Sequence, residues 1–150
     1  MSYYNYYIMI KILKFTFYIS LSFLVVISFW PGSLLGYLFY GDWKQQPDLI
    51  QNPFGTTINH FIYYFYISLL GLFIYFKNKN YSKVVYSLFF LSIILELSHL
   101  IIPNRSFEFG DLISNILGII VAYLVLKIYL LFNKKWIHLM IEKKVLKKSS

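Results

Sequence analysis

The sequence predicts an all-α membrane protein, a bundle of four transmembrane helices with both termini in the cytoplasm. Hydrophobic residues make up 59% of the 150 residues and charged residues only 13%, about half the charged share that covers a soluble domain. The 15 Phe, 15 Tyr and 3 Trp exclude a disordered chain, because such chains are poor in aromatic residues. The length favours one membrane domain over residues 1–150, with a core at 15–132 and a basic cytoplasmic tail at 133–150.

Four apolar stretches are long enough to cross a bilayer, which needs about 20 helical residues. The first runs from Phe15 to Trp30 and continues through Pro31-Gly32 into an apolar run that ends at Tyr40. Its basic flank and apolar core are like those of a signal peptide. No small-residue cleavage site follows it, so we expect an uncleaved anchor. The other three spans are predicted at residues 58–76, 84–102 and 112–132, separated by polar segments at 41–57, 77–83 and 103–111.

The placement of Lys and Arg predicts the orientation, because basic residues collect on the cytoplasmic side of a membrane protein. With four spans, 12 of the 14 basic residues fall on the side of the termini, and only Lys44 and Arg105 fall on the other. We therefore expect both termini inside the cell, anionic lipids beside the lysine tail, and no binding of nucleic acid. Lysine far outnumbers arginine, and Asn, Ile, Tyr and Phe are abundant. This composition is typical of an AT-rich bacterial genome, so we expect a bacterial inner membrane.

Polar side chains within the spans are the candidate functional residues, because a charged group that faces lipid is costly. All of them lie in the outer halves of their spans. Helical spacing places Glu96 on one face with His99, and Asp111 on one face with Asn115. We predict an outward-facing polar pocket beneath residues 103–111, with Arg105 as the ionic partner of Glu96 and Asp111 as the competitor for it. Its ligand-binding residues are His60, Glu96, His99, Arg105, Asp111 and Asn115.

Each of these residues also has a structural interpretation. Asn115 and Tyr64 can equally be hydrogen-bonding contacts between helices, and a satisfied interior histidine is the simpler interpretation of His60. For Glu96 we favour a functional role or a dedicated salt bridge over a chance placement, because a carboxylate at that depth needs a cationic partner or a raised pKa. Gly118 and Ala122 form a pair of small residues that allows close helix packing.

The stretch ELSHLIIPNRSFEFGDLISNILG, residues 96–118, resembles the core motif of VanZ-like membrane proteins. The Trp30-Pro31 exit of the first span is similar to that family as well, and His60-Phe61 resembles the family's histidine. His99 stands where the family usually has Gln, and Thr56-Thr57 stands where it commonly has Asp-Lys. The matching residues of the motif are Glu96, Pro103, Arg105, Asp111, Asn115 and Gly118.

The family takes its name from a teicoplanin-resistance factor. The resemblance therefore implies a VanZ-like domain that binds a cell-envelope or lipoglycopeptide-type ligand. Antibiotic resistance itself does not transfer from the motif alone.

Three functions remain open at this point. The first is binding of an anionic envelope glycolipid or peptide, with Arg105 holding the anionic group. The second is a membrane-embedded enzyme in which Glu96 performs acid–base chemistry with His60 or His99. The third is an accessory or assembly protein whose Gly118 and Ala122 face lipid and await a partner.

The enzyme hypothesis includes a metal-dependent form, in which the two histidines and a carboxylate hold a divalent ion. The chain has no cysteine, and its histidine spacing matches no zinc signature. We therefore expect no metal and no cofactor, and we favour a protein without catalytic activity. The sequence assigns neither a catalytic residue nor an oligomeric state.

Overall fold

The computed structural model describes residues 3–47, 55, 57–75 and 80–146, and it describes side chains within this range from residue 7 to residue 132. Three expectations concern residues or side chains outside the description. They are the replacement of the family's usual residue by Thr56, the position of Lys77 and Lys79 on the side of the termini, and the contact of the lysines beyond residue 132 with lipid.

The described chain consists of helices joined by turns and loops, and it contains no strand. Four of its helices are long and apolar enough to cross a membrane: Tyr7–Phe29 within the first helix, the third and fourth helices entire, and Phe109–Phe132 within the fifth. The predicted class, an all-α membrane protein with four spans, is therefore confirmed. The helices are α1 (Tyr3–Phe29), α2 (Leu34–Tyr40), α3 (Thr57–Tyr75), α4 (Tyr81–Ser98) and α5 (Phe109–Leu146).

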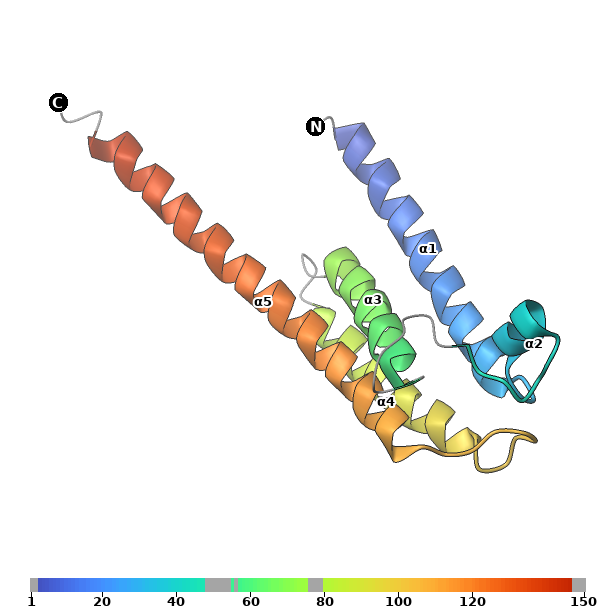
Figure 1. Cartoon of the computed structure of the whole chain (residues 1–150). Coiled ribbons are helices and arrows are strands. Elements are labelled where there is room, and N and C mark those ends of the chain that lie inside the picture. The colour runs from blue at the N-terminus through green and yellow to red at the C-terminus, as the bar shows by residue number, and fades with distance from the viewer. Residues whose placement is uncertain (1–2, 48–54, 56, 76–79, 147–150) are drawn as a thin grey trace.

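The four long helices alternate in direction along the bundle, so that both termini lie at the same end (Figure 1). The end of α1, the start of α3, the end of α4 and the start of α5 therefore gather at the opposite end. We call this the distal end. It brings together segments that are up to 80 residues apart in the chain.

Like α4, helix α3 packs against each of the other three long helices, and its contacts are the more extensive. Its contact with α5 is the most extensive in the molecule. Ile67 and Leu72 of α3 and Ala122 of α5 are fully buried. Among the four spans α1 is the least buried, and it packs against α3 and α4.

The contact between α3 and α5 depends on a close backbone approach at Gly118. A Cβ atom added there would lie 2.6 Å from the carbonyl oxygen of Phe61 and 2.8 Å from the backbone nitrogen of Phe65. Real Cβ atoms do not come this close to backbone, so only glycine fits without separating the helices. The Gly118 and Ala122 face is thus covered by α3 within one chain and does not face lipid, which removes the main support for the accessory-protein hypothesis.

The first apolar stretch does not form the continuous helix that its hydropathy suggests. Helix α1 ends at Phe29, and the chain turns through Pro31 and Gly32, which has a φ of +81°. Proline cannot donate a helical hydrogen bond, and this left-handed conformation is one that glycine adopts readily. A separate helix, α2, begins after Ser33, whose hydroxyl accepts the N–H of Gly36 at 2.9 Å.

The segment after the break folds back against the end of α1. The ring of Trp43 stacks on Tyr37 with centroids 3.9 Å apart, and on Trp30 with centroids 6.0 Å apart. The backbone N–H of Ser33 donates to the carbonyl of Trp43 at 2.7 Å. Helix α2 and the following turn therefore form a small aromatic cap at the distal end.

At the other end of the molecule, α5 extends past the predicted end of the fourth span at Phe132. It continues as a helix to Leu146, and its 38 residues correspond to about 57 Å at 1.5 Å per residue. The first part of the predicted basic tail is therefore a continuation of the transmembrane helix, which Figure 1 shows projecting beyond its neighbours.

The close approach at Gly118 predicts a specific loss of stability. Because the atoms that a Cβ would meet are backbone atoms of α3, we expect Gly118→Ala to destabilise the folded state by about 1–3 kcal/mol. The control is Gly110→Ala in the same helix, where the nearest atoms belong to the Thr57 side chain at 3.6 and 3.8 Å. This change should be neutral, or stabilising by up to about 1 kcal/mol.

Thermal unfolding of both variants in detergent, followed by far-ultraviolet circular dichroism, measures the difference. If Gly118→Ala unfolds at or above the temperature of Gly110→Ala, the backbone contact between α3 and α5 is not as close as described.

Candidate functional site

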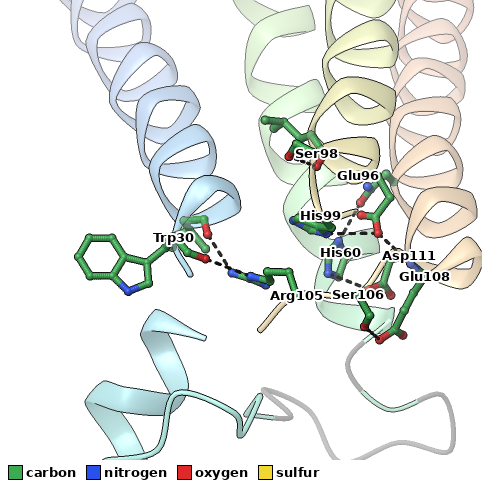
Figure 2. Close-up of polar contacts among 12 residues, drawn as sticks. Trp30, His60, Glu96, Ser98, His99, Arg105, Ser106, Glu108 and Asp111 are labelled. Atoms are coloured by element: carbon green, nitrogen blue, oxygen red, sulfur yellow. Dashed lines mark hydrogen bonds and ion pairs between the residues drawn. The ribbon is translucent and has the colours of Figure 1, made fainter. Parts of the chain in front are cut away.

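Polar side chains from three helices meet at the distal end and form what we call the distal polar cluster. Figure 2 shows its acidic and histidine side chains pointing toward one another from α3, α4 and α5. All of its members except His60 are buried, so they are shielded from solvent by protein. The cluster consists of His60 in the first turn of α3, Glu96 in the last turn of α4, His99 directly after α4, and Asp111 and Asn115 in the first two turns of α5.

Glu96 joins the end of α4 to the start of α5. Its side chain is only 1% exposed, and its Oε1 accepts the backbone N–H of Glu108 at 3.1 Å. The same oxygen lies 3.4 Å from Nδ1 of His99. A buried carboxylate needs such donors, and Glu96 obtains them from its own helix end and from the residue just before α5.

His60 joins α3 to α5 through both of its ring nitrogens. Nδ1 lies 3.2 Å from Oδ1 of Asn115, and Nε2 lies 3.3 Å from Oδ2 of Asp111. Asp111 occupies the first turn of α5, where the helix dipole favours a negative charge. Its other oxygen, Oδ1, is buried and has no hydrogen-bond partner among the described residues.

Arg105 points away from this cluster and toward α1. Its Nε donates to the carbonyl of Trp30 at 3.3 Å, and its Nη2 donates to the carbonyl of Ile27 at 2.9 Å. These carbonyls lie at the end of α1, where helical N–H partners run out, and the carbonyl of Ile27 also accepts the N–H of Trp30 at 3.2 Å. Arg105 therefore caps α1, as Figure 2 shows.

The expected ion pair between Arg105 and Glu96 is wrong: within the described range, Glu96 lies beside His99, and Asp111 lies beside His60. The cause is the path of the chain. Helix α4 ends at Ser98 rather than at residue 102, and the following segment swings out toward the end of α1 (Figure 1). Burial lowers the pKa of Arg105, while the charges of Glu96 and Asp111 act from a distance to raise it.

A cavity of about 170 Å³ lies beside the cluster, between α1, α2 and α3. Its walls are mostly apolar, with Phe23 and Leu24 from α1 among them. Three of the six residues predicted for the site line it, namely His60, His99 and Arg105. Glu96, Asp111 and Asn115 do not line it. The predicted set thus divides into a cavity wall and a buried network, which share His60 and His99.

Among the described residues, the side chains that could hold a metal ion together are His60, Glu96 and Asp111. One potential ligand atom from each lies within 4.8 Å of the other two. The sequence-based alternative of two histidines differs from this set, because Nδ1 of His99 turns to Glu96 and its Nε2 is buried without a described partner.

Sequence reasoning missed the backbone groups of the site. The carbonyls of Ile27 and Trp30 receive Arg105, and the N–H of Glu108 binds Glu96. Backbone atoms are present at every residue and leave no compositional signal. Only the general need of helix ends for hydrogen-bond partners could have indicated them.

The family model described as VanZ/LLP1 matches residues 2–132, a range that contains all four spans and the whole distal polar cluster. No curated protein and no solved structure matches the chain.

The bond between His60 and Asn115 predicts a second stability effect. Asn115 is 2% exposed, so Asn115→Leu would leave the Nδ1 side of His60 without its acceptor. We expect a loss of about 1–3 kcal/mol for a buried donor left unsatisfied. The control is Ser92→Ala, at an equally buried serine whose hydroxyl bonds only within its own helix, to the carbonyl of Phe89.

Thermal melting of both variants in the same detergent compares them directly. Equal melting temperatures for Asn115→Leu and Ser92→Ala would contradict the assignment of this bond as a connection between α3 and α5.

Proposed function

The chain belongs to the VanZ/LLP1 family, and from this membership and the distal geometry we propose that it binds an anionic, amphipathic molecule of the bacterial cell envelope. The observation that carries the proposal is the position of Arg105 on an otherwise largely apolar cavity. A cation beside apolar walls matches a molecule that has a hydrocarbon part and a phosphate or carboxylate.

Arg105 retains donors for such an anion. A guanidinium has five N–H groups, and the two bonds to α1 use Nε and one N–H of Nη2. The remaining fork can bind a phosphate or carboxylate oxygen pair. His60 and His99, which also line the cavity, are the further polar contacts we assign to the ligand.

The size of the cavity limits what it can enclose. Its volume of about 170 Å³ is below the roughly 300–1,000 Å³ of pockets that enclose a whole drug-sized ligand. We infer that it takes an anionic head group and the first part of a chain, and that the rest of the ligand remains in the lipid. An envelope lipid or a lipoglycopeptide-type molecule has this form. Antibiotic resistance is not part of the proposal.

The proposed location is the inner membrane of a bacterium, with the distal end outside. Lys11 and Lys14 lie in the first half of α1, Lys83 in the first turn of α4, and Lys127 in the last part of the fourth span. All four are thus toward the end of the bundle that holds the termini. The distal segments carry only Lys44 and Arg105. This asymmetry supports a cytoplasmic position for the termini, which directs the cavity to the outer leaflet.

The role of Arg105 predicts a defined loss of affinity. With dodecyl phosphate as the anionic probe, we expect Arg105→Lys to weaken binding about tenfold, or roughly 1.4 kcal/mol, because lysine cannot bind in the bidentate manner. Arg105→Met should weaken it further. Dodecylphosphocholine, whose phosphate is neutralised by a cationic group, should bind more weakly than dodecyl phosphate to the wild type.

Lys44→Met is the matched control, since Lys44 is the other distal cation, is exposed and does not line the cavity. Isothermal titration measures the affinity of the wild type and the three variants for the probe. Melting curves identify any variant that is unfolded. The proposal fails if Lys44→Met weakens binding as much as Arg105→Met, or if Arg105→Met binds as the wild type does.

The proposed orientation has its own test, which the absence of cysteine makes direct. We expect a membrane-impermeant maleimide to label Ser106→Cys, in the distal segment, on intact spheroplasts. Ser82→Cys, at the start of α4, should react only after the membrane is permeabilised. The reverse pattern would place the cavity on the cytoplasmic side.

A further inference from the structure

Three side chains of the distal polar cluster form a compact set of ligand-type atoms. His60 from α3, Glu96 from α4 and Asp111 from α5 each place one nitrogen or oxygen within 4.8 Å of the other two. Figure 2 shows the three side chains converging from separate helices. A metal bound at about 2.1 Å by three ligands holds neighbouring ligand atoms roughly 3.0–3.5 Å apart. The distance of 3.3 Å between His60 and Asp111 already falls in that range.

The hydrogen bond to Asn115 determines which atom His60 presents to this set. Oδ1 of Asn115 is an acceptor, so Nδ1 of His60 carries the proton that bonds to it. In a neutral imidazole, Nε2 then has a lone pair, and this lone pair faces the carboxylate oxygen of Asp111 at 3.3 Å. Two acceptors at that distance repel unless a positive charge lies between them.

The charges of the set also call for a cation. Glu96 is 1% exposed and Asp111 is 5% exposed, and the nearby guanidinium of Arg105 binds the carbonyls of α1. Oδ1 of Asp111 is buried without a hydrogen-bond partner among the described residues. The two buried carboxylates therefore have unused acceptor capacity, and a divalent ion would neutralise their combined charge.

We propose that His60, Glu96 and Asp111 bind a divalent metal ion at the junction of α3, α4 and α5. One imidazole with two carboxylates suits a first-row transition metal such as Mn²⁺ or Zn²⁺, whereas Mg²⁺ and Ca²⁺ prefer oxygen ligands alone. Glu96 closes the remaining gap of up to about 1.5 Å by a side-chain movement toward the other two ligands.

The surroundings of the three residues resemble the outer shell of metal sites. Metal-bound histidines donate their second N–H to a fixed acceptor, as His60 does to Asn115. Ligand carboxylates are in turn hydrogen-bonded, as Glu96 is to the backbone of Glu108. His60 has a side chain that is 24% exposed and lines the cavity, which provides a route for a hydrated ion.

The test uses the full-length protein, purified in detergent and stripped with a chelator, and the metal ion alone. This makes its outcome independent of any envelope ligand. We expect one equivalent of Zn²⁺ or Mn²⁺ to bind. Glu96→Gln and Asp111→Asn, which conserve shape but remove a charge, should weaken binding by more than about 100-fold, since even outer-shell changes cost roughly 10- to 100-fold.

Glu108→Gln is the matched control. It removes a neighbouring carboxylate, but the side chain of Glu108 is exposed and bonds to Ser106, and only its backbone N–H contacts Glu96. It should bind metal as the wild type does. Absence of saturable binding, or equal affinity in all four chains, would overturn the proposal and indicate that a proton shared by His60 and Asp111 separates the two acceptors.

A second measurement, electron paramagnetic resonance of bound Mn²⁺, tests the site even if a carboxylate variant does not fold, because it uses the wild type and histidine variants. The wild-type spectrum should show nitrogen coupling from one imidazole. His99→Gln should keep this coupling and His60→Gln should lose it. A spectrum of the wild type without nitrogen coupling would also overturn the assignment.

Discussion

A carboxylate enclosed within a membrane protein has no water to solvate it, so it must be matched by donors or cations from the protein itself. Glu96 and Asp111 are two such groups, and the distal end is arranged around them. Glu96 takes the N–H of Glu108 and lies against His99, and Asp111 lies against His60. These contacts join the ends of α3, α4 and α5. Helix α1 contributes no side chain to this cluster and is the least buried span, and at the distal end Arg105 caps it.

The parts of the structure that follow from hydrophobic length were predictable from the sequence. Four apolar stretches predicted four spans, and the depth of the polar residues predicted that His60, Glu96 and Asp111 would share one end of the bundle. The ends of the helices were less predictable. Residues 100–102 are apolar and extend the hydropathy of α4, yet the helix stops at Ser98. Likewise, residues 34–40 continue the first apolar stretch, but Pro31 and Gly32 break the backbone before them.

The error over Arg105 has a physical cause that applies to other membrane proteins. Charge complementarity pairs an arginine with a carboxylate at the same end of the bundle, but the carbonyls at a helix end are also strong acceptors. In this chain the carbonyls of Ile27 and Trp30 receive the guanidinium, and the backbone N–H of Glu108 serves the carboxylate instead. These two bonds hold Arg105 in place and leave its other N–H groups available. A structural role and a ligand-binding role are therefore compatible in the same side chain.

The glycine contact between α3 and α5 has a consequence for how this protein can move. Gly118 rests on the backbone next to His60, at Phe61, and lies three residues after Asn115. Sliding α5 by one turn, about 5.4 Å, would drive a larger residue into that contact and separate His60 from both of its partners at once. The glycine contact and the two contacts of His60 are satisfied at the same register of α3 on α5. Sliding of one helix along the other is therefore opposed by both. The contact of α1 with α3 at Gly71 involves the side chain of Phe17 instead of backbone, so it fixes the register of these two helices less strictly.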